Sequence, residues 1–153
     1  MIQRKQSLWL FIAALLNAGV FYFDLYRMHY ITHSTMNGMD TSIDSMGKIT
    51  VSEHFPSLLV AIVMTLLPLV AIFLFKNRGR QMGITALAIV AVIGFEALML
   101  MYVGNLGKQA TPPTTGSYWI GAILPVIAMI FMFFAIAGIR RDQKLVKSVD
   151  RLR

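Results

Sequence analysis

The sequence predicts an all-α fold, a four-helix transmembrane bundle with both termini in the cytoplasm (N-in/C-in), and three observations predict it. Only 14% of the 153 residues are charged and 57% are apolar, against about 25% charged in a typical soluble domain. The apolar residues gather in blocks, each close to the length that crosses about 30 Å of hydrocarbon as a helix, at 7–23, 57–75, 82–102 and 118–139. Most of the Lys and Arg residues lie in the N-terminus, in connector 76–81 and in tail 140–153. Four crossings place these basic segments on one face, and the positive-inside bias makes that face cytoplasmic.

The length predicts a single integral membrane domain over residues 1–153. The net charge of +7 reflects cations that lie between or beyond the apolar blocks, so it indicates topology and no nucleic-acid partner is expected. The absence of cysteine excludes disulfides, thiol catalysis and iron–sulfur ligation.

The first block, 7–23, has a cleaved signal peptide as its rival interpretation. Ala18 and Gly19 precede bulky aromatic residues, which disfavours a small-residue cleavage site and favours an uncleaved first helix. Asn17 lies among alanines in mid-span. We interpret it as a packing residue that hydrogen-bonds across a helix interface, in preference to an ion ligand.

Blocks 57–75 and 82–102 are joined by only six residues, so their helices must be antiparallel neighbours. Pro68 removes the helical hydrogen bond to the carbonyl of Met64 and is expected to kink its helix, unless Thr65 or a neighbouring helix satisfies that carbonyl. Small residues recur at helical spacing in the third block and predict a helix-packing face: Gly83, Ala86, Val90, Gly94 and Ala97.

Segment 24–55 is the one long hydrophilic stretch and is expected to form a short extracytoplasmic cap. Residues 47–52 alternate in a way that is compatible with a β-hairpin. His29 and His33, at i and i+4, would share one face if the segment were helical, and nearby methionines suit copper(I). The signal is weak, so these two are metal candidates only, and no cofactor is predicted.

The fourth block, 118–139, begins with an aromatic pair typical of a membrane interface and contains Pro125, which should bend it. A basic tail follows, 140–153, with leucine and valine at i, i+4 and i+7, which predicts an amphipathic continuation of the helix. Its cations are expected to contact anionic lipid or a protein: Arg140, Arg141, Lys144, Lys147, Arg151 and Arg153.

Glu96 is the one charge inside the third block, and Thr85, eleven residues earlier, shares its helix face. A carboxylate at membrane depth usually faces protein or water and is a functional hypothesis by default. Two interpretations stay open. Glu96 could accept a proton or cation within a path through the bundle, or it could hold helices in register by bonding to Asn17 or a backbone carbonyl.

Four stretches carry a resemblance to a known family. They are Met1-Ile2-Gln3-Arg4, Phe73 to Arg78 with Gln81, Gly121 to Pro125, and Gly138 to Arg153. The chain resembles a Bacteroidetes family of small four-span inner-membrane proteins catalogued as a domain of unknown function. The resemblance implies a bacterial inner membrane and four helices, and it implies no catalytic or binding residue.

No nucleophile–base pair, phosphate-binding glycine loop or paired carboxylates is found, so an enzyme is not expected. The role expected is a non-catalytic subunit or assembly factor of a larger membrane complex. The alternative is a small oligomeric channel or transporter subunit that uses Glu96, and a periplasm-facing metal or ligand sensor is the third. Expected partners are membrane lipids, anionic lipid at the cytoplasmic face, and a membrane protein or a second copy of the chain.

Overall fold

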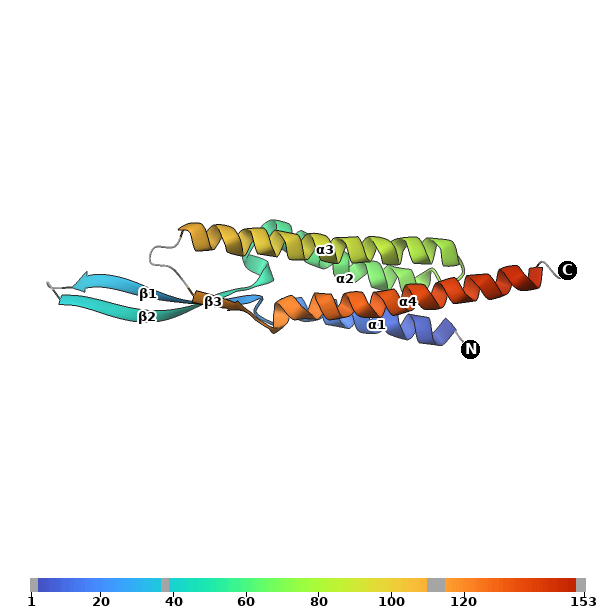
Figure 1. Ribbon diagram of the computed structural model, residues 1–153, viewed down its shortest axis with the longest axis horizontal. Helices are drawn as coiled ribbons and strands as arrows, with labels where there is room; N and C mark the ends of the chain where they lie inside the picture. Colours follow the sequence, from blue (N-terminus) through green and yellow to red (C-terminus); the bar gives the residue numbers. More distant parts are fainter. Residues whose placement is uncertain (1–2, 37–38, 110–114, 151–153) are drawn as a thin grey trace.

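The protein is elongated, with four helices gathered in a bundle and a small sheet that projects from one end (Figure 1). The computed structural model describes residues 3–36, 39–109 and 115–150. The helices are α1 Gln3–Ala18, continued by the 3-10 turn η1 Gly19–Phe21, then α2 Phe55–Phe73, α3 Arg78–Gln109 and α4 Ile120–Asp150, with a second short turn, η2 Val51–Glu53. The strands are β1 Tyr26–Met36, β2 Met39–Ile49 and β3 Thr115–Tyr118.

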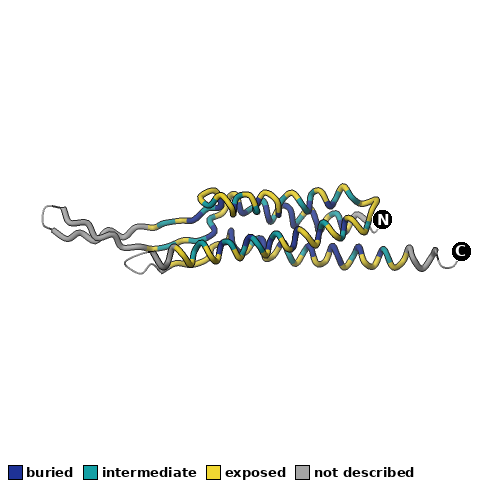
Figure 2. The backbone as a smooth tube through the Cα atoms, turned by 90° about the horizontal axis from the view of Figure 1, so that it is seen from above, coloured by how far each residue is buried: buried dark blue, intermediate teal, exposed yellow. Residues whose placement is uncertain are grey.

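The four helices run side by side, with α1 against α2 and α4, and α3 against α2. The start of α1 and the end of α4 both lie at the end of the bundle opposite the sheet (Figures 1 and 2). Residues from all four helices fill the core, and several large ones are fully buried, among them Leu10, Met64, Phe95 and Met132.

Three helices are long and apolar enough to cross a membrane: Phe55–Phe73, Arg78–Asn105 and Ile120–Leu145. The first apolar helix, Lys5–Phe21, is shorter. The bundle also exposes large hydrophobic side chains on every helix, for example Leu15, Leu66, Leu87 and Phe133. In water such a surface would be an aggregation liability, so hydrocarbon is the environment that matches it.

The sheet has the order β2-β1-β3 with antiparallel pairing throughout. The hairpin that residues 47–52 suggested is confirmed and is longer than expected, since β1 pairs with β2 from Tyr26↔Ile49 to Met36↔Met39. β3 pairs with only the first four residues of β1, so most of the hairpin extends beyond the bundle (Figure 1).

The connection between α3 and α4 corrects the predicted boundaries. The predicted helices were 82–102 and 118–139, whereas α3 continues to Gln109, Thr115–Tyr118 is a strand and α4 begins at Ile120. A four-residue strand that contains a glycine has no periodicity to detect. Its partner is β1, some 90 residues earlier, so β3 exists because of tertiary pairing.

The small-residue stripe of α3 also lies differently from the prediction. Gly83, Ala86, Val90 and Ala97 are exposed, and a Cβ added at Gly83 or Gly94 would meet nothing within 4 Å. The buried face of α3 is the adjacent one, formed by Thr85, Ala88, Val92, Phe95 and Met99. Both sets of residues recur at helical spacing, and the set with the larger side chains is the one buried in the core. The small-residue stripe is therefore not a packing face within this bundle.

Candidate functional site

Asn17 on α1 compensates for the helical hydrogen bond that Pro68 removes from α2. The Asn17 side chain is fully buried, and its Nδ2 donates a 2.8 Å hydrogen bond to the backbone carbonyl of Met64. That carbonyl is the one whose helical partner Pro68 removes, four residues later. α2 runs through Pro68 because α1 supplies the missing donor. Asn17 therefore acts as the cross-helix packing residue that the sequence suggested.

The threonine hydroxyls of Thr65 on α2 and Thr85 on α3 form hydrogen bonds within their own helices. Thr65 Oγ1 donates to the carbonyl of Ala61, and Thr85 Oγ1, which is fully buried, donates to the carbonyl of Gln81, both at 2.8 Å. Such bonds to the residue four positions earlier satisfy a hydroxyl locally. Thr85 thus makes no link to Glu96.

Glu96 is partly buried, and its Oε1 is buried without a hydrogen-bond partner among the described residues. Oδ1 of Asn17 is also buried without a hydrogen-bond partner, and the amide nitrogen of Asn17 donates to Met64. The structure therefore shows no hydrogen bond between Glu96 and Asn17. The Glu96 carboxylate contributes to raising the pKa of the Tyr118 hydroxyl, after partial burial and the neighbouring Tyr26. Because α3 runs from Arg78 to Gln109 toward the sheet (Figure 1), Glu96 lies in the half of the helix nearer the sheet.

Aromatic side chains gather at the same end of the bundle. The rings of Tyr26 and Tyr118 meet edge to face with centroids 5.2 Å apart. His54 stacks on Tyr102 with centroids at 4.5 Å, and its Nδ1 is 2.7 Å from the hydroxyl of the buried Ser57. Tyrosine and tryptophan at this level are typical of a membrane–water interface.

A buried polar cluster at the opposite end escaped the sequence analysis. Gln6 Nε2 donates to Asp142 Oδ2 at 2.6 Å, and both side chains are buried. Arg78 Nη1 donates to the backbone carbonyl of Asp142 at 2.9 Å. These bonds join α1, α3 and α4. Gln6 and Asp142 lie in polar segments near the two ends of the chain, where a sequence gives no sign that a side chain would be buried.

The basic tail continues α4 without a break, as predicted. Arg140, Arg141 and Lys144 are exposed at the level where α1 and α3 begin, because Asp142 between them bonds to Gln6 and Arg78. Beyond this level the last turns of α4 extend past the other helices (Figures 1 and 2). The side chain of Lys147, and Arg151 and Arg153 altogether, lie outside the described residues. Because Asp142 is tied to Gln6 and Arg78, the first turns of this extension are fixed to the bundle.

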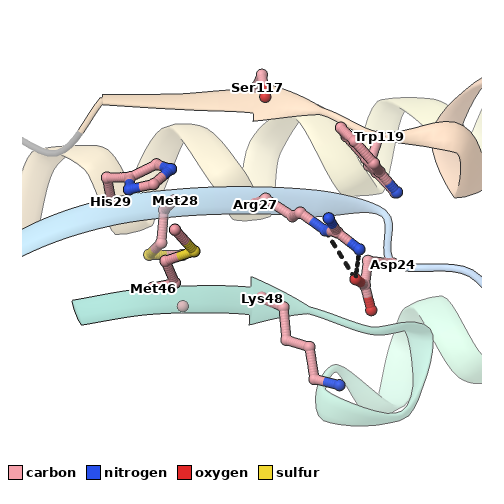
Figure 3. A pocket seen from close by; sticks show the side chains of 9 residues that line it. Asp24, Arg27, Met28, His29, Met46, Lys48, Ser117 and Trp119 are labelled. Atoms are coloured by element: carbon pink, nitrogen blue, oxygen red, sulfur yellow. Dashed lines mark hydrogen bonds and ion pairs between the residues drawn. The ribbon is translucent and has the colours of Figure 1, made fainter.

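At the sheet end, the base of the hairpin surrounds a pocket of about 500 Å³ (Figure 3). Arg27 packs over the ring of Trp119, 4.0 Å from its centroid, and forms an ion pair of 2.8 Å with Asp24. Lys48 lies directly opposite Arg27 across the two strands and forms no ion pair within the described ranges. The pocket therefore has a paired cation, an unpaired one and apolar walls from Met28, Met46 and Trp119.

The structure corrects the histidine hypothesis. His29 and His33 lie on strand β1, where residues four apart are about 13 Å from each other, so they cannot share one ion. Their predicted common face required a helix. No group of three or more His, Cys, Asp or Glu that could hold a metal is present in the part of the chain that the structure describes.

The comparisons with known proteins identify a family and say nothing about activity. None of the curated proteins compared with the chain matches it. A family model described as "Domain of unknown function (DUF4293)" matches residues 2–152, which is nearly the whole sequence. The resemblance noted at the two ends and at the basic connector is thereby confirmed. The chain belongs to the family of this domain of unknown function, DUF4293.

Proposed function

We propose that this protein is a non-catalytic subunit or assembly factor of a membrane complex in the bacterial inner membrane, with both termini in the cytoplasm. The observation that carries the proposal is the course of α4. Its 31 residues extend about 46 Å, well beyond the roughly 30 Å of hydrocarbon. The excess carries exposed cations and leaves the bundle without bending (Figure 1).

The course of α4 favours a protein partner over the lipid surface as the target of the tail. An amphipathic helix that binds a membrane surface lies in the interface plane, so it would need a bend where the span ends. α4 has no such bend, and the bonds from Gln6 and Arg78 to Asp142 hold the extension in line with the span. A rigid basic rod projecting from a membrane suits an acidic protein surface.

The exposed small-residue stripe of α3 supports the same proposal from within the membrane. Small residues allow close approach of another helix, and four of the five residues of this stripe are exposed. The protein therefore offers one surface to a helix in the lipid and another to a partner in the cytoplasm.

The experiment is pull-down in mild detergent followed by mass spectrometry, comparing the wild type with Arg141→Glu/Lys144→Glu. We expect a stoichiometric heterologous protein that the double variant loses. Lys76→Glu/Arg80→Glu, which reverses two exposed cations of the connector at the same end, is the matched control and should retain it. Recovery of the protein with itself alone would refute the proposal.

A second candidate, a small oligomeric channel or transporter subunit, has one observation in its favour, the buried and unpartnered Oε1 of Glu96. Against it, the buried residues between Thr85 and Glu96 on α3 are all apolar, so that stretch of α3 contributes no polar group to a path. Proteoliposome flux measurements decide: an ion or proton flux that Glu96→Gln abolishes, at unchanged protein abundance, would establish this function instead.

A further inference from the structure

A groove of about 430 Å³ lies between α3 and α4, in the half of the bundle that faces the chain termini. One cation and five apolar residues line it: Ala86, Ile89, Phe133, Ile136, Ala137 and Arg140. The four residues of α4 follow the spacing i, i+3, i+4 and i+7, so they form one stripe that ends at Arg140. The two alanines are exposed and give the groove its depth.

The level of the groove follows from the length of α4. Arg140 comes 20 residues after Ile120, which corresponds to about 30 Å of helix and matches the thickness of the hydrocarbon core. With Ile120 at one boundary of the hydrocarbon, Arg140 lies at the other. The apolar part of the groove is then at the depth of acyl chains, and the guanidinium is at the depth of lipid phosphates.

The charges around the opening favour an anion. Arg140 is exposed and forms no ion pair within the described residues, and Arg141 and Lys144 are exposed within about one turn of it. The nearby acid, Asp142, is buried and accepts a hydrogen bond from Gln6, so it is not available to neutralise them. An unpaired guanidinium at headgroup depth binds phosphate with charge-assisted hydrogen bonds.

We propose that the groove is a binding site for one anionic phospholipid of the leaflet at the terminal end of the bundle. The phosphate binds Arg140, and the upper part of one acyl chain packs against Ala86 and Ala137. Free phosphate would make no contact with the apolar part of the groove, whereas a phospholipid fills that part with an acyl chain. A lipid is therefore the occupant. This inference does not depend on the cytoplasmic partner proposed above, and Ala86 is the residue that the groove shares with the small-residue stripe of α3.

Native mass spectrometry tests the site on the full-length protein, purified from nanodiscs that contain equal amounts of phosphatidylglycerol and phosphatidylcholine. We expect one phosphatidylglycerol to stay bound. Arg140→Gln removes the phosphate contact and should lower its retention by about tenfold. Ala137→Phe fills the groove without changing any charge and should lower it as well.

Two variants serve as matched controls and should retain the lipid. Lys76→Gln removes an exposed cation at the same end of the bundle. Ala97→Phe makes the same substitution at an exposed alanine on the face of α3 that carries Ala86, about 16 Å farther along the helix. Equal loss in all four variants, no preference for phosphatidylglycerol, or full retention by Ala137→Phe would each overturn the proposal. Circular dichroism confirms that each variant is folded.

Discussion

At the scale of single residues, the bundle is organised by satisfying polar groups that the membrane would otherwise leave unpaired. In hydrocarbon an unsatisfied backbone carbonyl costs several kcal/mol, so a proline inside a span needs a donor from elsewhere. Asn17 supplies that donor to Met64, and Gln6 does the same for the buried carboxylate of Asp142. Among the described residues, Oδ1 of Asn17 and Oε1 of Glu96 are the exceptions, and the oxygen of Glu96 gives the alternative function its basis.

The Asn17–Met64 bond predicts a specific coupling. Asn17→Leu keeps the size of the side chain but removes the donor, and should destabilise the bundle by about 1 kcal/mol, the usual scale for polar contacts between membrane helices. In a Pro68→Ala background the restored N–H bonds to the Met64 carbonyl, so the same substitution should cost less. A double-mutant cycle by unfolding in detergent measures the difference. Additive effects would contradict this account. Leu15→Ala, on the exposed face of α1, is the control.

Tyr118 predicts a pH dependence. Partial burial, Tyr26 and the Glu96 carboxylate raise the pKa of its hydroxyl above the usual 10.0. A raised folded-state pKa contributes stability below the unfolded-state pKa, and that contribution is lost as the pH rises through the folded-state value. Ultraviolet titration should therefore show one late-ionising tyrosine that is absent from Tyr118→Phe. Glu96→Gln should lower that pKa, whereas an unchanged titration would place the carboxylate elsewhere.

At the scale of elements, two junctions decide how the sheet is fixed to the bundle. The N–H of Trp119 donates to the carbonyl of Leu25, and the N–H of Gly121 donates to the carbonyl of Asp24, each at 3.0 Å. Leu25 in turn donates to the carbonyl of Ile49. The start of α4 is thereby bonded to the segment that leads into β1, and the hairpin is held at its base although its far end extends beyond the bundle (Figure 1).

The close approach at Gly121 gives a prediction with an internal control. A Cβ at Gly121 would lie 2.6 Å from the Asp24 carbonyl oxygen and 2.8 Å from that of Phe23, which are backbone atoms and cannot rotate away. Gly121→Ala should therefore destabilise the protein by about 1–3 kcal/mol. Gly83→Ala meets nothing and should be neutral or stabilising by about 0.5–1 kcal/mol. Thermal unfolding in detergent compares the two, and equal effects would argue against the junction.

At the scale of the whole molecule, the arrangement is a hydrophobic bundle with aromatic residues at one end and cations at the other. The N- and C-terminal ends lie together, at the end that carries the exposed Arg80, Arg140 and Arg141. On the positive-inside bias, we propose that this end faces the cytoplasm and the hairpin the opposite side. This sidedness is the part of the proposal on which the choice of partners depends.

Protease accessibility in intact spheroplasts tests the orientation. An epitope fused after Arg153 should be protected, and one inserted between β1 and β2 should be digested. Detergent lysis, which exposes both epitopes, controls for their intrinsic susceptibility. Digestion of the C-terminal epitope in intact cells would reverse the assignment and move the basic extension of α4 outside.

The sequence by itself determined the four helices and their antiparallel order, because hydrocarbon excludes ions and demands about 20 apolar residues per crossing. It also indicated the hairpin through the alternation at residues 47–52. Only the tertiary structure decided which stripe of α3 is buried, that Thr115–Tyr118 is a strand, and which donor serves the carbonyl opposite Pro68. Each of these depends on a neighbour distant in sequence, and periodicity along one helix cannot say which of its faces that neighbour will cover.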